Sequence, residues 1–332
     1  MKIEIAEIMN ENGKMYEWAS KVVAKATLTE DEMSISSVVD KWAKEIGEKG
    51  ADPNHEIAEF VRRTIEPEVY NAYESLLDEM FNRGAVGEFD TIVTNKTPKN
   101  TLKAYLAGKG GNVDKSYIDW DSLKTESYHT QIETEISYED LRRNGFKSIA
   151  NLTTYALESF TNDMVARTFD IIDNAIVGGE QVISVSGGTI TKPEADKLSL
   201  YAIDNATNGE QPMVIALSKY AQQLANMSGY TSFMSDDMKD KYNRKGLVEV
   251  YGGMNIKSIP SAMKTADGTT LVPDKRMFAI SGKIGNLDKR GDIRVLETLD
   301  NNKEVVNLKF TGFQFDVTIT DISKVAKVSF SA

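Results

Sequence analysis

A single long run of helical periodicity, residues 148–177, constrains the fold of this chain more than any other feature. Its apolar residues recur mostly at every fourth position, close to the 3.6-residue period of an α-helix, so they share one face. About 30 residues at ~1.5 Å each predict a helix of about 45 Å, longer than most helices in globular domains. The expected packing face comprises Ile149, Leu152, Ala156, Phe160, Met164, Ile171 and Ala175. A long helix of this kind, with a projecting hairpin before it, is better suited to spanning and joining subunits than to enclosing a reactive group.

The segment before this helix has the pattern of a projecting hairpin. Two short runs, 101–106 and 115–120, flank a Gly-rich stretch, as two strands flank a turn. They carry too few large apolar residues to form a core, so we expect the hairpin to extend from the body. Residues 130–136 then alternate polar and apolar side chains like a half-buried strand. Ser137 and Asp140 have the spacing of a helix-start signal.

The acidic excess of the chain lies near its N-terminus. The formal net charge of the 332 residues is −11; residues 1–80 hold 9 Lys and Arg against 18 Asp and Glu, which leaves 30 against 32 in residues 81–332. Proteins that read nucleic acid carry a basic face instead, so we interpret this charge as a solvated helical surface. No run approaches the ~18 apolar residues of a membrane span, and the acidic N-terminus does not resemble a secretory signal. Without cysteine there is no disulfide framework, and we expect cytosolic synthesis.

The remaining pattern predicts an α+β fold. Residues 1–80 favour helices with little core of their own. Beyond the long helix we expect a small hairpin at 181–191, a helix at 193–206, a strand at 213–217 and a helix capped by Ser218. Further strands, rich in β-branched and aromatic residues, are expected at 89–94, 247–251, 255–259, 277–280, 293–297, 305–311, 313–320 and 325–330.

A search for catalytic or ligand-binding motifs finds none. The two histidines, His55 and His129, are far apart and lack a metal-ligand spacing. Lys109 lies in a Gly-rich stretch that has neither the spacing of a phosphate loop nor a helix after it. The tripeptide Arg290-Gly291-Asp292 matches an adhesion motif by its letters, and we expect it in a polar turn between strands. We therefore predict that the chain is not an enzyme and needs no cofactor or metal.

The order and residues of these elements resemble the major capsid protein of tailed bacteriophages, which has the Hong Kong 97 fold. The resemblance covers about residues 85–332 and includes the hairpin, the strand 131–136 and the long helix after it. The most similar segments are MVIALS (213–218), GLVEVYGGM (246–254) and DKRGDI (288–293). No one of these strings is diagnostic, and it is their order that carries the resemblance.

The resemblance implies a division of the chain into parts. These are an acidic helical N-terminal extension or arm (1–84), an arm strand with the extended hairpin or E-loop (85–130), a peripheral domain with the long spine helix (131–178), an axial α/β domain (179–292), closing strands of the peripheral domain (293–320) and a C-terminal strand that returns to the axial domain (321–332).

The implied function is self-assembly into the icosahedral head shell that encloses packaged double-stranded DNA. The implied location is the virion, with synthesis and assembly in the host cytoplasm. The implied partners are copies of the chain itself, as hexamers and pentamers, together with scaffold, portal and decoration proteins, with weak nonspecific contact to DNA and no membrane. The hairpin residues expected to contact a neighbouring subunit are Lys103, Tyr105, Lys109, Tyr117 and Trp120.

Some members of that family join their subunits covalently through a hairpin lysine and an asparagine of the closing strands. Lys103 or Lys109 and Asn307 match these two roles here. Gln314 stands where the assisting carboxylate is expected, and an amide is a poor general base. We therefore expect no covalent cross-links.

Several alternatives stay open at the level of sequence. Residues 1–80 are either a permanent arm or a scaffold-like segment that is removed later. An encapsulin-like shell around cargo protein shares the resemblance. An α/β enzyme rests only on the strand and helix at 213–227, and an adhesion module only on the tripeptide at 290–292.

Overall fold

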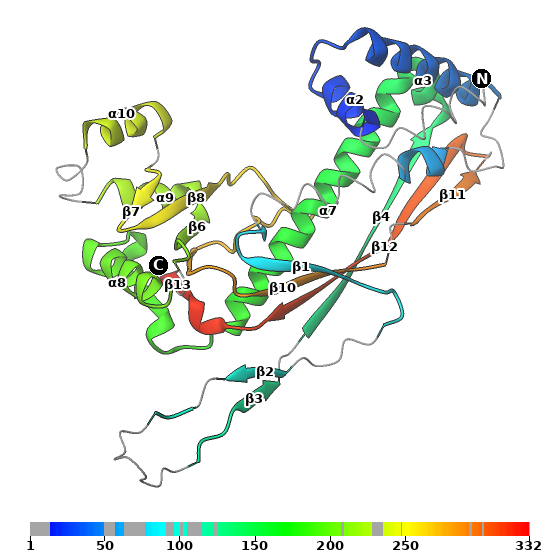
Figure 1. Ribbon diagram of the computed structural model, residues 1–332. Helices are drawn as coiled ribbons and strands as arrows, with labels where there is room; N and C mark the ends of the chain where they lie inside the picture. The colour runs from blue at the N-terminus through cyan, green and yellow to red at the C-terminus, as the bar shows by residue number, and fades with distance from the viewer. Residues whose placement is uncertain are drawn as a thin grey trace.

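The computed structural model shows a long central helix with a β-sheet toward each end and a hairpin that projects from one side (Figure 1). The structure describes residues 14–49, 57–62, 77–90, 96–99, 102–104, 115–122, 125–206, 209–227, 235–246, 248–291, 294–300 and 302–331.

The predicted long helix is observed as α7 (Phe146–Ala175, 30 residues). The short helix α6 (Tyr138–Asn144) precedes it and is capped as expected, since the Asp140 amide donates to the Ser137 hydroxyl at 3.0 Å. The two helices meet at Gly145, whose φ of +51° is a conformation that residues with a Cβ rarely adopt. On α7, six residues of the expected face are found as follows: Ile149, Ala156, Phe160, Met164 and Ile171 are buried and Leu152 is half-buried.

A five-stranded sheet lies along the first part of α7. Its strands are β1 (Phe81–Val86), β4 (Thr125–Ser137), β10 (Gly285–Arg290), β11 (Arg294–Asp300) and β12 (Val305–Ile319). β12 is the centre: β4 pairs along one side of it, while β10 and β11 share the other side. The Phe160 ring of α7 meets the Phe310 ring of β12 edge-on, with centroids 6.1 Å apart. This contact fixes the helix on the apolar face of the sheet.

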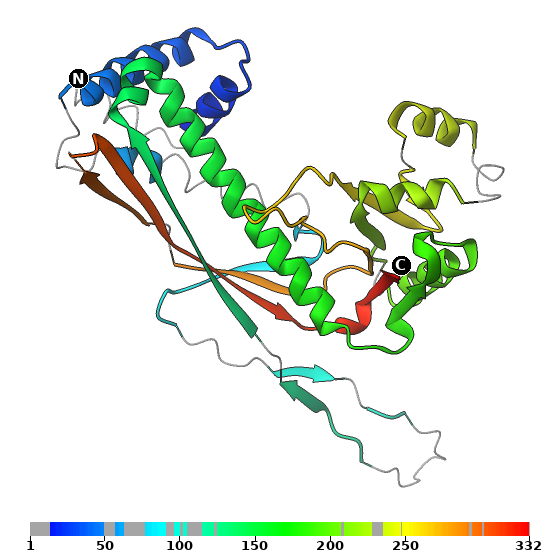
Figure 2. The same ribbon diagram turned by 180° about the vertical axis from the view of Figure 1, so that it is seen from behind.

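A six-stranded sheet lies toward the other end of α7 (Figure 2). Its strands, in spatial order, are β5 (Val182–Val185), β13 (Val325–Phe330), β9 (Arg276–Ile280), β6 (Met213–Leu217), β8 (Met254–Ile259) and β7 (Val250–Tyr251). The helices α8 (Lys192–Asp204) and α9 (Ser218–Ala225) contact this sheet, and α10 (Asp236–Lys245) follows α9 along the chain. Phe169 of α7 stacks on Phe278 of β9 at 5.7 Å, so the same helix is anchored in both sheets.

Three local predictions are wrong. Residues 181–191 form no hairpin: β5 pairs in parallel with β13, and a short 3-10 turn, Ser186–Gly188, follows it. Ser218 does not cap α9, because its hydroxyl donates to the Ile259 carbonyl at 3.3 Å. The strand expected at 89–94 is not observed at residues 89–90, which lie in a turn after β1, and 91–94 lie outside the described residues.

The observed strands also differ from expectation in two other places. The strands expected at 305–311 and 313–320 are one strand, β12, with an irregular register between Phe310 and Phe313. Gly312 between them has a φ of +82°, which permits the local kink without ending the strand. The structure also adds β10, which the sequence pattern did not predict.

The N-terminal helices pack onto the body of the protein and bury their apolar side chains there. α2 (Lys14–Val23) and α3 (Glu30–Lys49) pack against α6 and α7. Trp18 is fully buried, with its ring 6.1 Å from that of Phe146, and its Nε1 donates to Ser36 Oγ at 2.8 Å. Trp42 is also buried and lies against Phe60. The buried side chains of these helices join the main hydrophobic core, in agreement with the expectation that the helices have little core of their own.

Candidate functional site

The described residues of the projecting hairpin do not belong to the hydrophobic core of the body. Its base is formed by β2 (Lys96–Lys99) and β3 (Asp119–Ser122), which pair antiparallel. This pairing lies nearer the base of the hairpin than the predicted runs 101–106 and 115–120. Closer to the tip, the Lys103 amide donates to Ser116 Oγ at 3.2 Å. Figures 1 and 2 both show β2 and β3 pointing away from the two sheets.

The described part of the hairpin presents its side chains to solvent. Lys103 is exposed, Tyr117 is 74% exposed, and Leu102 and Ile118 are exposed as well. Trp120 belongs to β3, while Tyr105 and Lys109 lie outside the described residues. The structure thus places Lys103, Tyr117 and Trp120 on the same hairpin, with apolar surface available for a partner.

Both ends of the hairpin are attached to the five-stranded sheet. The outgoing chain leaves from β1, which pairs in parallel with β10, and the returning chain enters β4. At the return, Thr125 Oγ1 lies 2.7 Å from Thr318 Oγ1 of β12. The sheet therefore determines where the hairpin starts and ends.

A buried ion pair fixes the outgoing end. The Arg290 Nε donates to Asp316 Oδ2 at 2.9 Å, and Asp316 is fully buried. The same guanidinium donates through Nη1 to the Asp90 carbonyl at 2.6 Å and more distantly to the Glu88 carbonyl at 3.5 Å. Arg294 adds an ion pair to the Glu88 carboxylate. These contacts connect the turn after β1 to β10 and β12.

Arg290 has a structural role in the sheet and not the adhesion role that the letters of the tripeptide suggest. The side chain of Arg290 is only 14% exposed and is engaged in the sheet, so it is not presented as an adhesion tripeptide requires. The role of its partner Asp316 could not be predicted from the sequence. The chain holds 50 Asp and Glu residues, and only the pairing of the strands shows which of them is buried beside Arg290.

A second carboxyl group lies beside the buried ion pair. Asp288 of β10 is opposite Asp316 in the antiparallel register. Burial and then the negative charge of Asp316 raise the pKa of Asp288 above its ordinary value. Asp316 Oδ1 is buried with no hydrogen-bond partner. Ionisation of Asp288 is therefore less favourable here than for an aspartate in solvent.

Two of the residues considered for cross-linking, Asn307 and Gln314, lie in β12 of the five-stranded sheet, whereas Lys103 lies on the hairpin. Asn307 lies in β12 opposite Glu135 of β4, and the Gln314 amide lies 3.1 Å from His129 Nδ1. That contact gives Gln314 and His129 a structural partner each.

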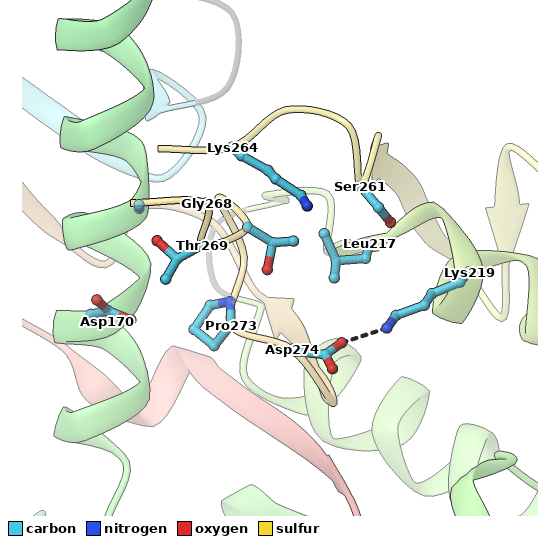
Figure 3. A pocket seen from close by; sticks show the side chains of 11 residues that line it. Asp170, Leu217, Lys219, Ser261, Lys264, Gly268, Thr269, Pro273 and Asp274 are labelled. Atoms are coloured by element: carbon cyan, nitrogen blue, oxygen red, sulfur yellow. Dashed lines mark ion pairs between the residues drawn. The ribbon is translucent and has the colours of Figure 1, made fainter. Parts of the chain in front are cut away.

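A cleft of about 540 Å³ lies between α7, α9 and the loop that joins β8 to β9 (Figure 3). Lys219 and Asp274 form an ion pair across it at 2.6 Å, which raises the pKa of Lys219 and lowers that of Asp274. The Tyr220 hydroxyl donates to the same carboxylate at 3.1 Å. Asp170 on α7 also lines the cleft, and burial raises its pKa.

Polar side chains line much of this cleft. Its described lining holds lysine, aspartate, serine and threonine side chains, and its central lysine and carboxylate neutralise each other. Among the residues that the structure describes, no three His, Cys, Asp or Glu side chains are grouped as metal ligands. In the same part of the chain, no helix is long and apolar enough to cross a membrane.

Solved structures of similar fold come from tailed-phage particles. The chain is similar to the capsid of the cyanophage P-SCSP1u, with 11% identity, a TM-score of 0.52 and coverage of 77% of this chain and 88% of that one. It is similar to a chain from Gordonia phage Cozz, with 12% identity, a TM-score of 0.52 and coverage of 80% and 87%. It is also similar to a chain from Mycobacterium phage Ogopogo, with 13% identity, a TM-score of 0.52 and coverage of 77% and 92%. At these identities the likeness establishes the fold.

The sequence itself connects the chain to one family. No curated protein matches it. A family model described as "SPbeta prophage-derived putative capsid protein YonB" matches residues 4–327. The predicted resemblance to phage capsid proteins is confirmed, and the encapsulin-like alternative is not favoured. Because the match spans nearly the whole chain, this protein belongs to the YonB family of prophage-derived capsid proteins and is a structural protein of the capsid shell.

Proposed function

We propose that this capsid protein closes its shell by placing the hairpin of each subunit over a neighbouring copy. The observation that carries the proposal is the hairpin: it leaves the five-stranded sheet and exposes Leu102, Tyr117 and Ile118, and its described residues lie outside the hydrophobic core. Exposed apolar side chains on a projecting element mark a surface made for association. Lys103, Tyr105, Lys109, Tyr117 and Trp120 are the proposed contact residues.

The shell that we propose is the icosahedral head around packaged double-stranded DNA, built from hexamers and pentamers. A closed shell forms through many repeated contacts between identical subunits, so extended elements serve it better than a pocket does. The near-neutral charge of residues 81–332 supports weak, nonspecific contact with the genome. Assembly would take place in the host cytoplasm, with scaffold, portal and decoration proteins as further partners.

We also propose that the role is structural alone, without an enzymatic step. The cleft between α7 and the β8–β9 loop supports this, because its Lys219 and Asp274 are engaged with each other. The parts outlined from the sequence, from the N-terminal arm (1–84) to the C-terminal strand (321–332), are likewise our proposed division of the subunit. Residues 1–84 are proposed to remain as a permanent arm, supported by the burial of Trp18 against α7.

Deletion of residues 103–116 tests the hairpin. We expect a folded subunit with an unchanged melting temperature, since the described residues of this segment lie outside the cores, and no closed shells in negative-stain micrographs. The matched control is a substitution variant, in which a Gly/Ser stretch of the same length replaces residues 103–116. Closed shells of normal diameter from the deletion would contradict the proposed role.

A further inference from the structure

The turn after β1 combines a fixed backbone with an exposed aromatic ring. The Asp90 amide donates to the Gly87 carbonyl at 3.1 Å, and the Gly87 amide donates to Asp90 Oδ2 at the same distance. Between these residues, Phe89 is 90% exposed. Exposure of a phenyl ring to water is unfavourable in free energy compared with its burial. An exposed ring on an ordered turn is therefore a candidate contact site.

A buried ion pair holds this turn in place. The Arg290 guanidinium bridges the buried Asp316 carboxylate and the Asp90 carbonyl, at 2.9 and 2.6 Å. A buried ion pair contributes little net stability compared with apolar packing, because both ions lose their hydration. What the pair does supply is a defined geometry, and here the geometry that it defines is that of the main chain beside Phe89.

The surroundings of Phe89 have the layout of a contact site. Glu88 and Arg294 pair beside it and keep 35% and 60% of their side chains exposed. An apolar centre with a charged, solvated rim is the usual pattern of protein interfaces, and aromatic anchors dominate their binding energy. A ring held in place before binding loses little conformational freedom on association.

We propose that the turn Gly87–Asp90 is a preorganised contact between copies of this chain, with the Phe89 ring as its apolar anchor. The partner is a second copy because the chain is a shell protein and because the turn is the root of the hairpin that we propose to lie on a neighbour. The inference rests on that proposed function and adds a defined surface to it.

Assembly of a Phe89→Ala variant tests the anchor. Because the ring is 90% exposed in the subunit, we expect an unchanged melting temperature. The protein concentration at half-maximal assembly, measured by light scattering, should rise about tenfold or more, as for a hot-spot residue. Phe89→Leu, which keeps an apolar side chain, should restore most of the assembly. Assembly of F89A at the wild-type concentration would overturn the inference.

A labelling experiment tests burial of the same position directly. The chain has no cysteine, so Phe89→Cys provides a single thiol. A maleimide should modify it rapidly in free subunits and at least about tenfold more slowly in assembled particles, since a buried contact excludes the reagent. Val177→Cys, at a residue 93% exposed, controls for reactivity in free subunits. Equal rates for F89C in subunits and particles would refute the inference, whereas a failure of the unmodified chain to form particles would contradict the proposed function itself.

Discussion

Replacing Trp18 by Ala measures how firmly the N-terminal helices are joined to the spine helix. Trp18 is fully buried, its ring lies 6.1 Å from Phe146, and its Nε1 donates to Ser36 Oγ at 2.8 Å. Large-to-small changes at buried aromatic residues cost about 3–5 kcal/mol, from lost transfer energy and the remaining cavity. The lost hydrogen bond adds about 1 kcal/mol at most, because the Ser36 hydroxyl keeps its own bond to the Glu32 carbonyl. We expect a total loss of about 3–6 kcal/mol in the free energy of unfolding.

Urea denaturation followed by far-ultraviolet circular dichroism measures this free energy, and hydrogen exchange locates the loss. Exchange should accelerate in α2, in α3 and in the part of α7 that they cover. Met33→Ala is the matched control on the same helical pair, since Met33 is 55% exposed and its change should stay within about 0.5 kcal/mol. A W18A chain within 1 kcal/mol of the wild type would refute the argument, because it would mean that the helices are docked too loosely for their burial to matter.

Four other predictions follow from the sheet and the helix joint. Arg290→Gln should lower the free energy of unfolding by about 3–5 kcal/mol because it leaves the Asp316 charge buried alone, and the double variant R290Q/D316N should regain more than half of it in chemical denaturation. Asp288→Asn should raise the melting temperature near neutral pH, where burial and Asp316 penalise the ionised carboxyl; this gain should shrink as pH falls through the raised pKa, and a gain independent of pH would contradict the assignment. Gly145→Ala should cost about 1–3 kcal/mol, since φ is +51° and the new Cβ would collide with the Asp40 carboxylate. Boiled particles on a denaturing gel should run as a single band of monomer size, and a ladder would show that cross-links form after all.

Periodicity predicted the elements whose signal is local. The strand Met213–Leu217 is five consecutive buried residues and was predicted with its bounds, as was β13. α7 was predicted within two residues at each end. In these segments the apolar residues of the sequence are the ones that the structure buries, so local periodicity is enough to predict the element.

The errors occur where the partner is distant in sequence. The Gly-rich turn that follows β5 predicts it as half of a hairpin, but its hydrogen bonds go to β13, 145 residues later. β1 has the sequence FNRGAV, which has little strand character and is held as a strand by β10. No local pattern contains such pairings, so they could not be predicted from periodicity alone.

The candidate site was predictable in outline and not in its details. The Gly-rich pattern predicted the hairpin, and the exposed Tyr117 follows from its lack of a core. The Phe89 region was predicted as a strand because aromatic and β-branched residues follow one another there. In the structure the ring faces solvent and the chain turns, since the Arg290–Asp316 pair holds the Asp90 carbonyl. That contact depends on the register of two strands and has no signature in either segment.

The place of β13 in its sheet has a consequence for how the protein is made. The strand lies between β5 and β9, and it is synthesised after both of them. Until then β5 has no neighbour in the sheet and β9 lacks one of its two. A nascent chain therefore cannot complete the body that contains α8 and α9, and a product of interrupted translation keeps two open strand edges. Unpaired strand edges favour aggregation, so we expect chains that end before β13 to form no stable subunit.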